Sequence, residues 1–175
     1  MASNWLNAYV LHRRPYRETS FIVDFFTLEL GRVSAVARGV RSTKSDRRSL
    51  LQPFQALRVQ LSGKSDLKNL TQLESNGALR MLTGNALYCA LYVNEITNRV
   101  LPGGVEAAEL YSAYATALAA LQQEQAAAEY ILRQYELALL QELGVMPDFT
   151  TDAASNDSIE PTFHYELVPE LGFCQ

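Results

Sequence analysis

Cysteine and histidine are scarce in this sequence of 175 residues, which contains two of each. Cys89 and Cys174 lie far apart and cannot build a disulfide framework, so we expect a reducing compartment and two small core thiols. His12 and His164 have no cysteine or histidine neighbour at the spacing of metal ligands. The sequence therefore predicts no metal site.

The motifs of catalysis and nucleotide binding are also missing. Gly31–Gly39 contains no GxGxxG, and the chain has neither a GxxxxGK(S/T) phosphate loop nor a GxSxG elbow. No stretch reaches the roughly 18 uninterrupted apolar residues of a membrane span, and Met1–Trp5 lacks the basic flank of a signal peptide. We expect a cytoplasmic protein with no membrane contact, no catalytic residue, no enzymatic activity and no cofactor.

Cations are almost absent from the second half of the chain. Residues 81–175 contain two Lys or Arg and thirteen Asp or Glu, whereas residues 1–80 contain thirteen Lys or Arg and six Asp or Glu. The overall charge of −4 thus conceals a basic half and an acidic half. This asymmetry indicates contact of the basic half with nucleic acid or a membrane. The alternative is two domains of opposite charge that attract each other.

The first 75 residues have the pattern of a small closed β-barrel. Short apolar runs alternate with turn signals about every ten residues, and Leu57, Val59 and Leu61 share one face of the clearest run. Closure also removes exposed strand edges. The expected strands are Trp5–His12, Thr19–Phe26, Val33–Val40, Phe54–Ser62 and Leu67–Glu74.

The second half has the periodicity of helices. Thr83 is a candidate cap for a helix that runs to about Leu101 and is apolar almost all round, which predicts a central, buried helix. Two more helices are expected over about Glu106–Gln122 and Gln125–Leu143. A strand over Phe163–Leu167, a turn over Val168–Gly172 and a return strand from Phe173 complete the prediction.

Two basic segments are candidate contacts for a phosphate backbone. Arg38–Arg48 has five cations in eleven residues and is expected to form an exposed loop, and His12–Arg17 places an aromatic ring beside three arginines. The alternatives are a solvated loop without a partner and an ordinary turn with Tyr16 packed on the barrel. The candidate contacts are Arg13, Arg14, Tyr16, Arg38, Arg41, Lys44, Arg47, Arg48, Lys64 and Lys68.

Polar residues on two of the expected helices also admit two interpretations. Asn94 and Glu95 interrupt an apolar helix, and hydrogen bonding to neighbouring helices is favoured over a functional site. Arg133, the only cation after Arg99, lies between Tyr130 and Tyr135 and is suited to hold a carboxylate beside an apolar pocket. The alternative is an intrahelical pair with Glu129 or Glu136.

Six stretches in the same order as in a known family extend from near the start of the chain to its helical half. They are Val10–Ser20, Thr27–Arg32, Val36–Arg41, Leu51–Phe54, Leu91–Glu95 and Tyr135–Gly144. On these stretches the chain resembles the bacterial RecO family of recombination mediators. The resemblance implies an α+β protein with an OB-fold barrel over residues 1–78 and a helical domain over residues 79–175.

The resemblance also implies a function and a set of partners. It implies binding of single- and double-stranded DNA, strand annealing, work with RecR, contact with the acidic tail of single-stranded-DNA-binding protein, and indirect loading of RecA at the nucleoid. Tyr130, Arg133 and Tyr135 would then receive that tail. The competing hypothesis is an adaptor whose basic barrel binds an acidic protein.

Two departures from the family are expected. Some relatives carry a four-cysteine zinc site after the third helix, but Asp148–Asn156 contains no cysteine, so no zinc is expected. Family members usually continue for dozens of residues past the Phe173–Cys174 equivalent. We therefore expect a truncated helical domain and an incomplete pocket for the tail.

Overall fold

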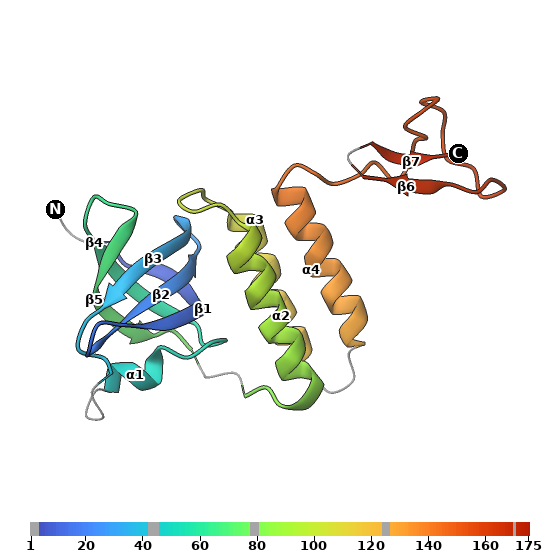
Figure 1. Cartoon of the computed structure of the whole chain (residues 1–175). Helices are drawn as coiled ribbons and strands as arrows, with labels where there is room; N and C mark the ends of the chain where they lie inside the picture. Colours follow the sequence, from blue (N-terminus) through green and yellow to red (C-terminus); the bar gives the residue numbers. More distant parts are fainter. Residues whose placement is uncertain (1–3, 42–45, 78–80, 124–126, 170) are drawn as a thin grey trace. The chain divides into compact units, whose positions relative to one another are not determined.

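A closed barrel of five strands forms the first part of the chain (Figure 1). The computed structural model describes residues 4–41, 46–77, 81–123, 127–169 and 171–175. The strands pair in the order β1-β2-β3-β5-β4, and only the β3–β5 pair is parallel. Their bounds are β1 (Leu6–Tyr16), β2 (Ser20–Thr27), β3 (Gly31–Ala37), β4 (Leu57–Ser62) and β5 (Leu67–Ser75). The predicted OB-like barrel is confirmed.

Alternation along the strands places one set of side chains inside the barrel. Val23 and Phe25 of β2 point inward and are fully buried, as expected for the apolar face of a half-buried strand. The short helix α1 (Asp46–Leu50) lies between β3 and β4, and the flanking Val40 and Leu51 join the same core. This crossover segment is what allows β3 and β5 to run parallel.

The main differences from the predicted strands lie at β1, β4 and the basic segment. β1 continues four residues past His12, so the basic cluster lies within the strand and not after it. β4 begins at Leu57 because Phe54 has a φ of 69°, outside the β region. The prediction of an uninterrupted exposed loop was wrong for Arg47 and Arg48, which belong to α1.

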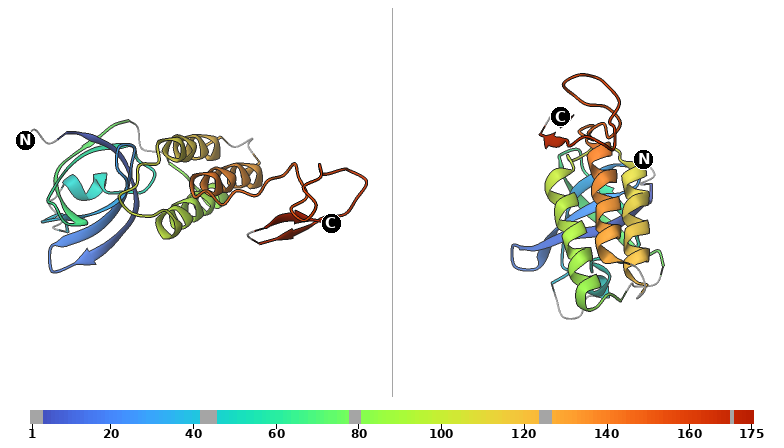
Figure 2. Two further views of the ribbon diagram at one scale, coloured as in Figure 1. Left: turned by 90° about the horizontal axis from the view of Figure 1, so that it is seen from above. Right: turned by 90° about the vertical axis from the view of Figure 1, so that its right-hand side faces the viewer.

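Three helices follow the barrel: α2 (Gly84–Val100), α3 (Ala108–Leu121) and α4 (Ala128–Glu142). They lie side by side in both views of Figure 2, and each matches its predicted range within three residues. Thr83 stands at the cap position of α2 but makes no capping hydrogen bond with its side chain. The prediction that α2 is buried all round was wrong, because Tyr88 is 71% exposed.

The barrel and the helices are joined by a buried hydrogen-bond network. The side chain of Asn94 on α2 donates to the carbonyl oxygens of Val10 and Leu11 on β1 and accepts from the Tyr114 hydroxyl on α3. These bonds support the structural interpretation of Asn94. The rings of Tyr9 and Phe26 also pack against Tyr114, at centroid distances of 5.0 and 5.8 Å.

Contacts group residues 1–139 in one unit and residues 140–175 in a second. The second unit contains a hairpin of β6 (Glu166–Val168) and β7 (Gly172–Cys174), as predicted, but β6 begins three residues after the predicted start at Phe163. The buried carboxylate of Asp152 accepts hydrogen bonds from the backbone amides of Ala154 and Gln175, which lie on either side of the hairpin in sequence. Within the described ranges, no helix has both the length and the apolar character needed to cross a bilayer.

Candidate nucleic-acid interface

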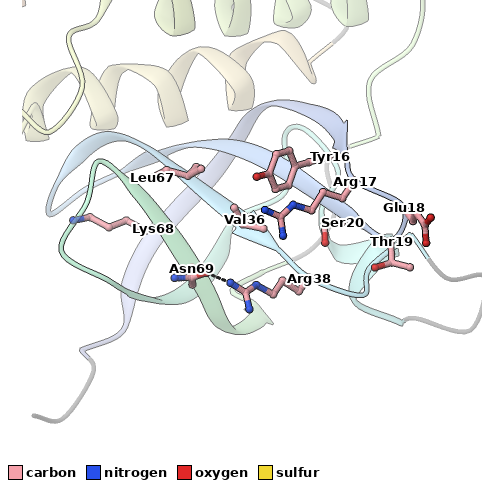
Figure 3. Close-up of a pocket in the computed structure, with 10 residues that line it drawn as sticks. All are labelled: Tyr16, Arg17, Glu18, Thr19, Ser20, Val36, Arg38, Leu67, Lys68 and Asn69. Carbon is pink, nitrogen blue, oxygen red and sulfur yellow. Dashed lines mark hydrogen bonds between the residues drawn. The ribbon is translucent and has the colours of Figure 1, made fainter.

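A groove on the outer surface of the barrel brings together basic and aromatic side chains from β1, from β5 and from the residues that directly follow β1 and β3 (Figure 3). It has a volume of about 690 Å³ and lies against the end of the β1–β2 hairpin, β3 and the start of β5. Its lining residues are Tyr16, Arg17, Glu18, Thr19, Ser20, Val36, Arg38, Leu67, Lys68 and Asn69.

Alternation along β1 decides which basic residues reach this outer surface. Arg13 lies on the inner side, where its guanidinium donates to the carbonyl oxygen of Leu51 at 2.8 Å and covers the Phe21 ring at 5.3 Å. Arg14 and Tyr16 lie on the other side of the strand, where Arg14 is exposed and Tyr16 lines the groove. A strand with period two separates neighbouring side chains in this way.

The backbone of the hairpin is held in an uncommon conformation at Arg17, whose φ is 53°. The side chain of Arg41 donates to the carbonyl oxygen of Arg17 at 2.8 Å, and the Arg41 amide donates to the carbonyl oxygen of Thr19 at 3.0 Å. The Arg17 guanidinium lies 5.1 Å from the centroid of the Tyr16 ring. Arg41 therefore supports the turn that presents Tyr16 and Arg17 to the groove.

The groove carries an excess of positive charge. Arg17, Arg38 and Lys68 face one carboxylate, that of Glu18, among the lining residues. Arg38 donates to Asn69 Oδ1 at 3.1 Å, and the Lys68 ammonium donates to the Gly63 carbonyl oxygen at 3.3 Å. Among the described residues, Arg38 and Lys68 have no further hydrogen-bond acceptor, so each has N–H groups left for a ligand. This arrangement suits phosphate oxygens, and an aromatic ring beside them suits a stacked base.

Several predicted contact residues have structural roles outside this groove. Burial, followed by the nearby charge of Arg48, lowers the pKa of the Arg13 guanidinium. Arg47 donates to the carbonyl oxygen of Thr71 on β5 at 3.3 Å and thereby ties α1 to the barrel. Arg48 is exposed on α1, and Lys64 is exposed in the β4–β5 turn. Lys44 lies outside the described residues.

Sequence reasoning included Arg38, Tyr16 and Lys68 in the site but did not select Arg17 or Asn69. Arg17 is the last residue of the basic segment His12–Arg17 and directly follows β1, so its neighbours were a usable signal. Asn69 gave no signal in the sequence, because only the pairing of β3 with β5 brings it to Arg38. Arg14 belongs to another cavity, between β1 and α2.

The residues predicted to receive an acidic tail are separated in the structure. Tyr130 and Tyr135 line an apolar cavity of about 380 Å³ between α3 and α4, but Arg133 is not among its lining residues. Arg133 instead forms an ion pair with Glu136, which also accepts from the Tyr92 hydroxyl at 2.7 Å. The intrahelical alternative with Glu136 is thus present in the structure.

Burial dominates the chemistry of Tyr135 itself. Its hydroxyl lies 2.6 Å from Thr97 Oγ1 and is enclosed between the helices. Burial raises the pKa of this hydroxyl well above its ordinary value, although the hydrogen bond with Thr97 acts in the opposite direction. Tyr130, in contrast, is 66% exposed and accessible to a partner.

Comparison with known proteins gives a consistent assignment along the whole chain. Residues 1–78 match the family described as recombination protein O N terminal, and residues 81–175 match recombination protein O C terminal. The chain is 59% identical over 175 residues to the DNA repair protein RecO of Alteromonas mediterranea, covering all of this chain and 74% of that protein. It is 53% identical over 172 residues to the protein of the same name from Pseudoalteromonas atlantica, covering 98% of this chain and 71% of that protein.

Proposed function

The chain belongs to the RecO family of DNA repair and recombination proteins, and from this premise we propose that it binds DNA through the groove beside the β1–β2 hairpin. RecO proteins are non-enzymatic recombination mediators. We assign DNA binding to the barrel, residues 1–78, and contacts with partner proteins to residues 79–175. The observation that carries the proposal is the convergence of Tyr16, Arg17, Arg38 and Lys68 in one groove.

The proposed mechanism is physical and requires no bond to be made or broken. Arg17, Arg38 and Lys68 neutralise phosphates and release their counterions, which supplies affinity for single and double strands of any sequence. Tyr16 adds a surface on which an unpaired base can stack. Because neutralised strands repel each other less, the same contacts would assist annealing.

The direct test replaces Arg17, Arg38 and Lys68 with alanine, singly and together. Each lost phosphate contact removes about one unit from the slope of log affinity against log salt, so the triple variant should lose up to about three units. Arg58→Ala is the matched control, because Arg58 pairs with Glu74 and covers Trp5 on another part of the barrel. A triple variant with unchanged affinity and slope would exclude the groove.

We propose that the acidic helical region binds RecR and the tail of single-stranded-DNA-binding protein, and that the protein thereby helps to load RecA at the nucleoid. Arg133 is the only Lys or Arg on α4, the helix that also carries the exposed Tyr130. A tail carboxylate would have to compete with Glu136 for Arg133. Binding by exchange of one carboxylate for another is favourable only where the tail adds apolar contacts, which Tyr130 can supply.

Arg133→Glu tests this second assignment against a closely matched control. Arg99 on α2 is also an exposed helical arginine with an intrahelical carboxylate partner, Glu95. Arg133→Glu should weaken binding of the acidic tail peptide by about tenfold or more, a typical effect of reversing a charge in a paired contact, and Arg99→Glu should not. Both should retain affinity for DNA. Equal peptide affinity in the two variants would place the tail elsewhere.

The alternative function is an adaptor whose basic barrel binds an acidic protein. The groove charge alone is compatible with it, because carboxylates and phosphates both pair with arginine. Affinity for oligonucleotides of any sequence, with a steep salt dependence, favours DNA as the partner. Binding confined to one acidic protein, with none to oligonucleotides at low salt, would favour the adaptor.

A further inference from the structure

The chain leaves the barrel through an exposed dipeptide, Asn76–Gly77, which directly follows β5. It is the only asparagine–glycine pair in the sequence. We propose that Asn76 is a site of spontaneous covalent modification, at which the side-chain amide is converted to a carboxylate with release of ammonia, and that Asn7 slows this conversion. The inference does not depend on the proposed binding of DNA.

The reaction joins the backbone nitrogen of Gly77 to Cγ of Asn76. As this N–Cγ bond forms, the Cγ–Nδ2 bond breaks, and the proton of the Gly77 amide leaves with the side-chain nitrogen as ammonia. The product is a cyclic succinimide. Water then opens the ring at one of its two carbonyl carbons, which gives aspartate or isoaspartate. In isoaspartate the backbone passes through the former side-chain carbon. No oxidant or reductant takes part.

The surroundings of Gly77 favour its nitrogen as the attacking group. Among the described residues, the Gly77 amide donates no hydrogen bond. Nothing lies within 4 Å of the position that a Cβ would occupy. The φ of Gly77 is +140°, a conformation that favours glycine, and glycine is the residue whose backbone rotates most freely. The nitrogen is therefore accessible and can be brought to Cγ of the preceding residue.

The other asparagines are in places where the same attack is hindered. Five of them lie in strands or in α2, where the backbone dihedral angles are fixed: Asn7, Asn69, Asn85, Asn94 and Asn98. The amide that follows Asn156 belongs to Asp157 and donates to Ser155 Oγ at 3.2 Å. The residue that follows Asn4 is the bulky Trp5. Asn76 should therefore react first.

A chain of hydrogen bonds restrains the side chain of Asn76. Its Nδ2 donates to Asn7 Oδ1 at 3.2 Å, and Asn7 Nδ2 donates in turn to the Glu29 carboxylate at 2.8 Å. The bond between Asn76 and Asn7 must break before the amide can turn toward the Gly77 nitrogen. The net free energy of one such bond corresponds to a factor of up to about ten in rate. Asn7 should slow the conversion by this factor.

Conversion would also weaken the attachment of this segment to the barrel. The new carboxylate has no donor and would face Asn7 Oδ1, which is an acceptor because Asn7 Nδ2 is engaged with Glu29. The backbone amide of Asn76 donates to the Ala56 carbonyl oxygen at 2.9 Å. A rerouted backbone in isoaspartate would disturb this bond too. We therefore expect the modified protein to be less stable.

The test incubates the whole protein in mildly alkaline buffer, because the attacking group is the deprotonated amide, and follows the tryptic peptide of residues 69–80 by mass spectrometry. Conversion adds about one mass unit, and fragmentation locates it. Asn69 in the same peptide is the internal control, since it lies in β5 and accepts from Arg38. Asn76 should be converted while Asn69 stays intact, and Asn76→Gln should abolish the change. Equal conversion at both positions, or none at either, would overturn the site.

Two further measurements test the role of Asn7. Asn7→Ala, with its fold checked by circular dichroism, should convert up to about tenfold faster than wild type. The wild-type chain unfolded in urea should convert at least as fast as this variant. A rate equal to that of the folded wild type in either case would overturn the restraint by Asn7.

The structural consequence has its own comparison. Asn76→Asp should have a lower melting temperature than Asn76→Ala, because both lack the donor to Asn7 but only the carboxylate is repelled by Asn7 Oδ1. Equal melting temperatures would overturn the expected loss of stability.

Discussion

Replacing Asn94 with alanine should loosen the joint between the barrel and the helices. The register of β1 against β2 shifts between Val10 and His12, so the strand is irregular at Leu11. The Asn94 side chain donates to the carbonyl oxygens of Val10 and Leu11 at 3.2 and 3.1 Å. Asn94 therefore supplies donors from α2 at a place where the β-ladder is irregular.

The magnitude follows from the groups that would be left unpaired. Asn94→Ala removes two donors from buried carbonyl oxygens and the acceptor of the Tyr114 hydroxyl, which lies 2.5 Å away. Each buried group left without a partner costs about 1–3 kcal/mol. With partial relaxation we expect a loss of roughly 3–5 kcal/mol in the free energy of unfolding. Tyr114→Phe alone should cost roughly 1–2 kcal/mol, because only one of these bonds is lost.

The assay is equilibrium unfolding in urea, followed with two probes. Fluorescence of Trp5, the only tryptophan, reports on the barrel strand where Arg58 covers its ring, and far-ultraviolet circular dichroism reports on the helices. The double variant of Asn94→Ala and Tyr114→Phe should lose less than the sum of the single losses, by about 1 kcal/mol or more. A loss below about 1 kcal/mol for Asn94→Ala, or strictly additive losses, would refute the reasoning.

Three further predictions concern backbone strain and pH. Gly31→Ala should lower the melting temperature strongly, because φ at Gly31 is +61° and the new Cβ would lie 1.8 Å from the Val105 carbonyl oxygen. Gly39→Ala is the control, because φ at Gly39 is similar but the new Cβ would meet open space, so the free energy of unfolding should fall by only about 1–2 kcal/mol. Hydrogen bonds from backbone amides, of which that of Ala154 contributes most, hold the pKa of Asp152 below its ordinary value. The ionised carboxylate therefore stabilises residues 140–175 above about pH 4, and this stabilisation is lost as the pH falls further. Hydrogen exchange of that unit should show this loss, and Asp152→Asn should show it already at neutral pH. Burial raises the pKa of Tyr135, so the unfolded chain releases this proton first and the free energy of unfolding should fall by about 1.4 kcal/mol per pH unit above about pH 10. Tyr135→Phe should remove that part of the slope in alkaline unfolding curves.

The partner of each basic residue depended on contacts that local patterns do not encode. Arg13 and Arg14 are adjacent and chemically identical, yet Arg13 donates to the carbonyl oxygen of Leu51, which follows α1, and Arg14 lines a cavity beside α2. Arg133 was identified as unusual from the sequence, but its pairing with Glu136 and its separation from the apolar cavity became visible only in the folded helices. Sequence proximity to Tyr130 and Tyr135 did not place all three side chains on one face.

The sequence by itself determined the charge division, the alternating strands, the three helices and the family. These features depend on local periodicity and on composition, which a linear chain displays directly. Only the tertiary structure decided the composition of the groove and of the cavity between β1 and α2. Tyr16 and Lys68 are more than fifty positions apart, and both line the groove because barrel closure pairs β3 with β5. The side-chain Oδ1 of Asn98 is buried without a hydrogen-bond donor, and this too is a property of the packed joint, because the same atom in an unfolded chain accepts hydrogen bonds from water.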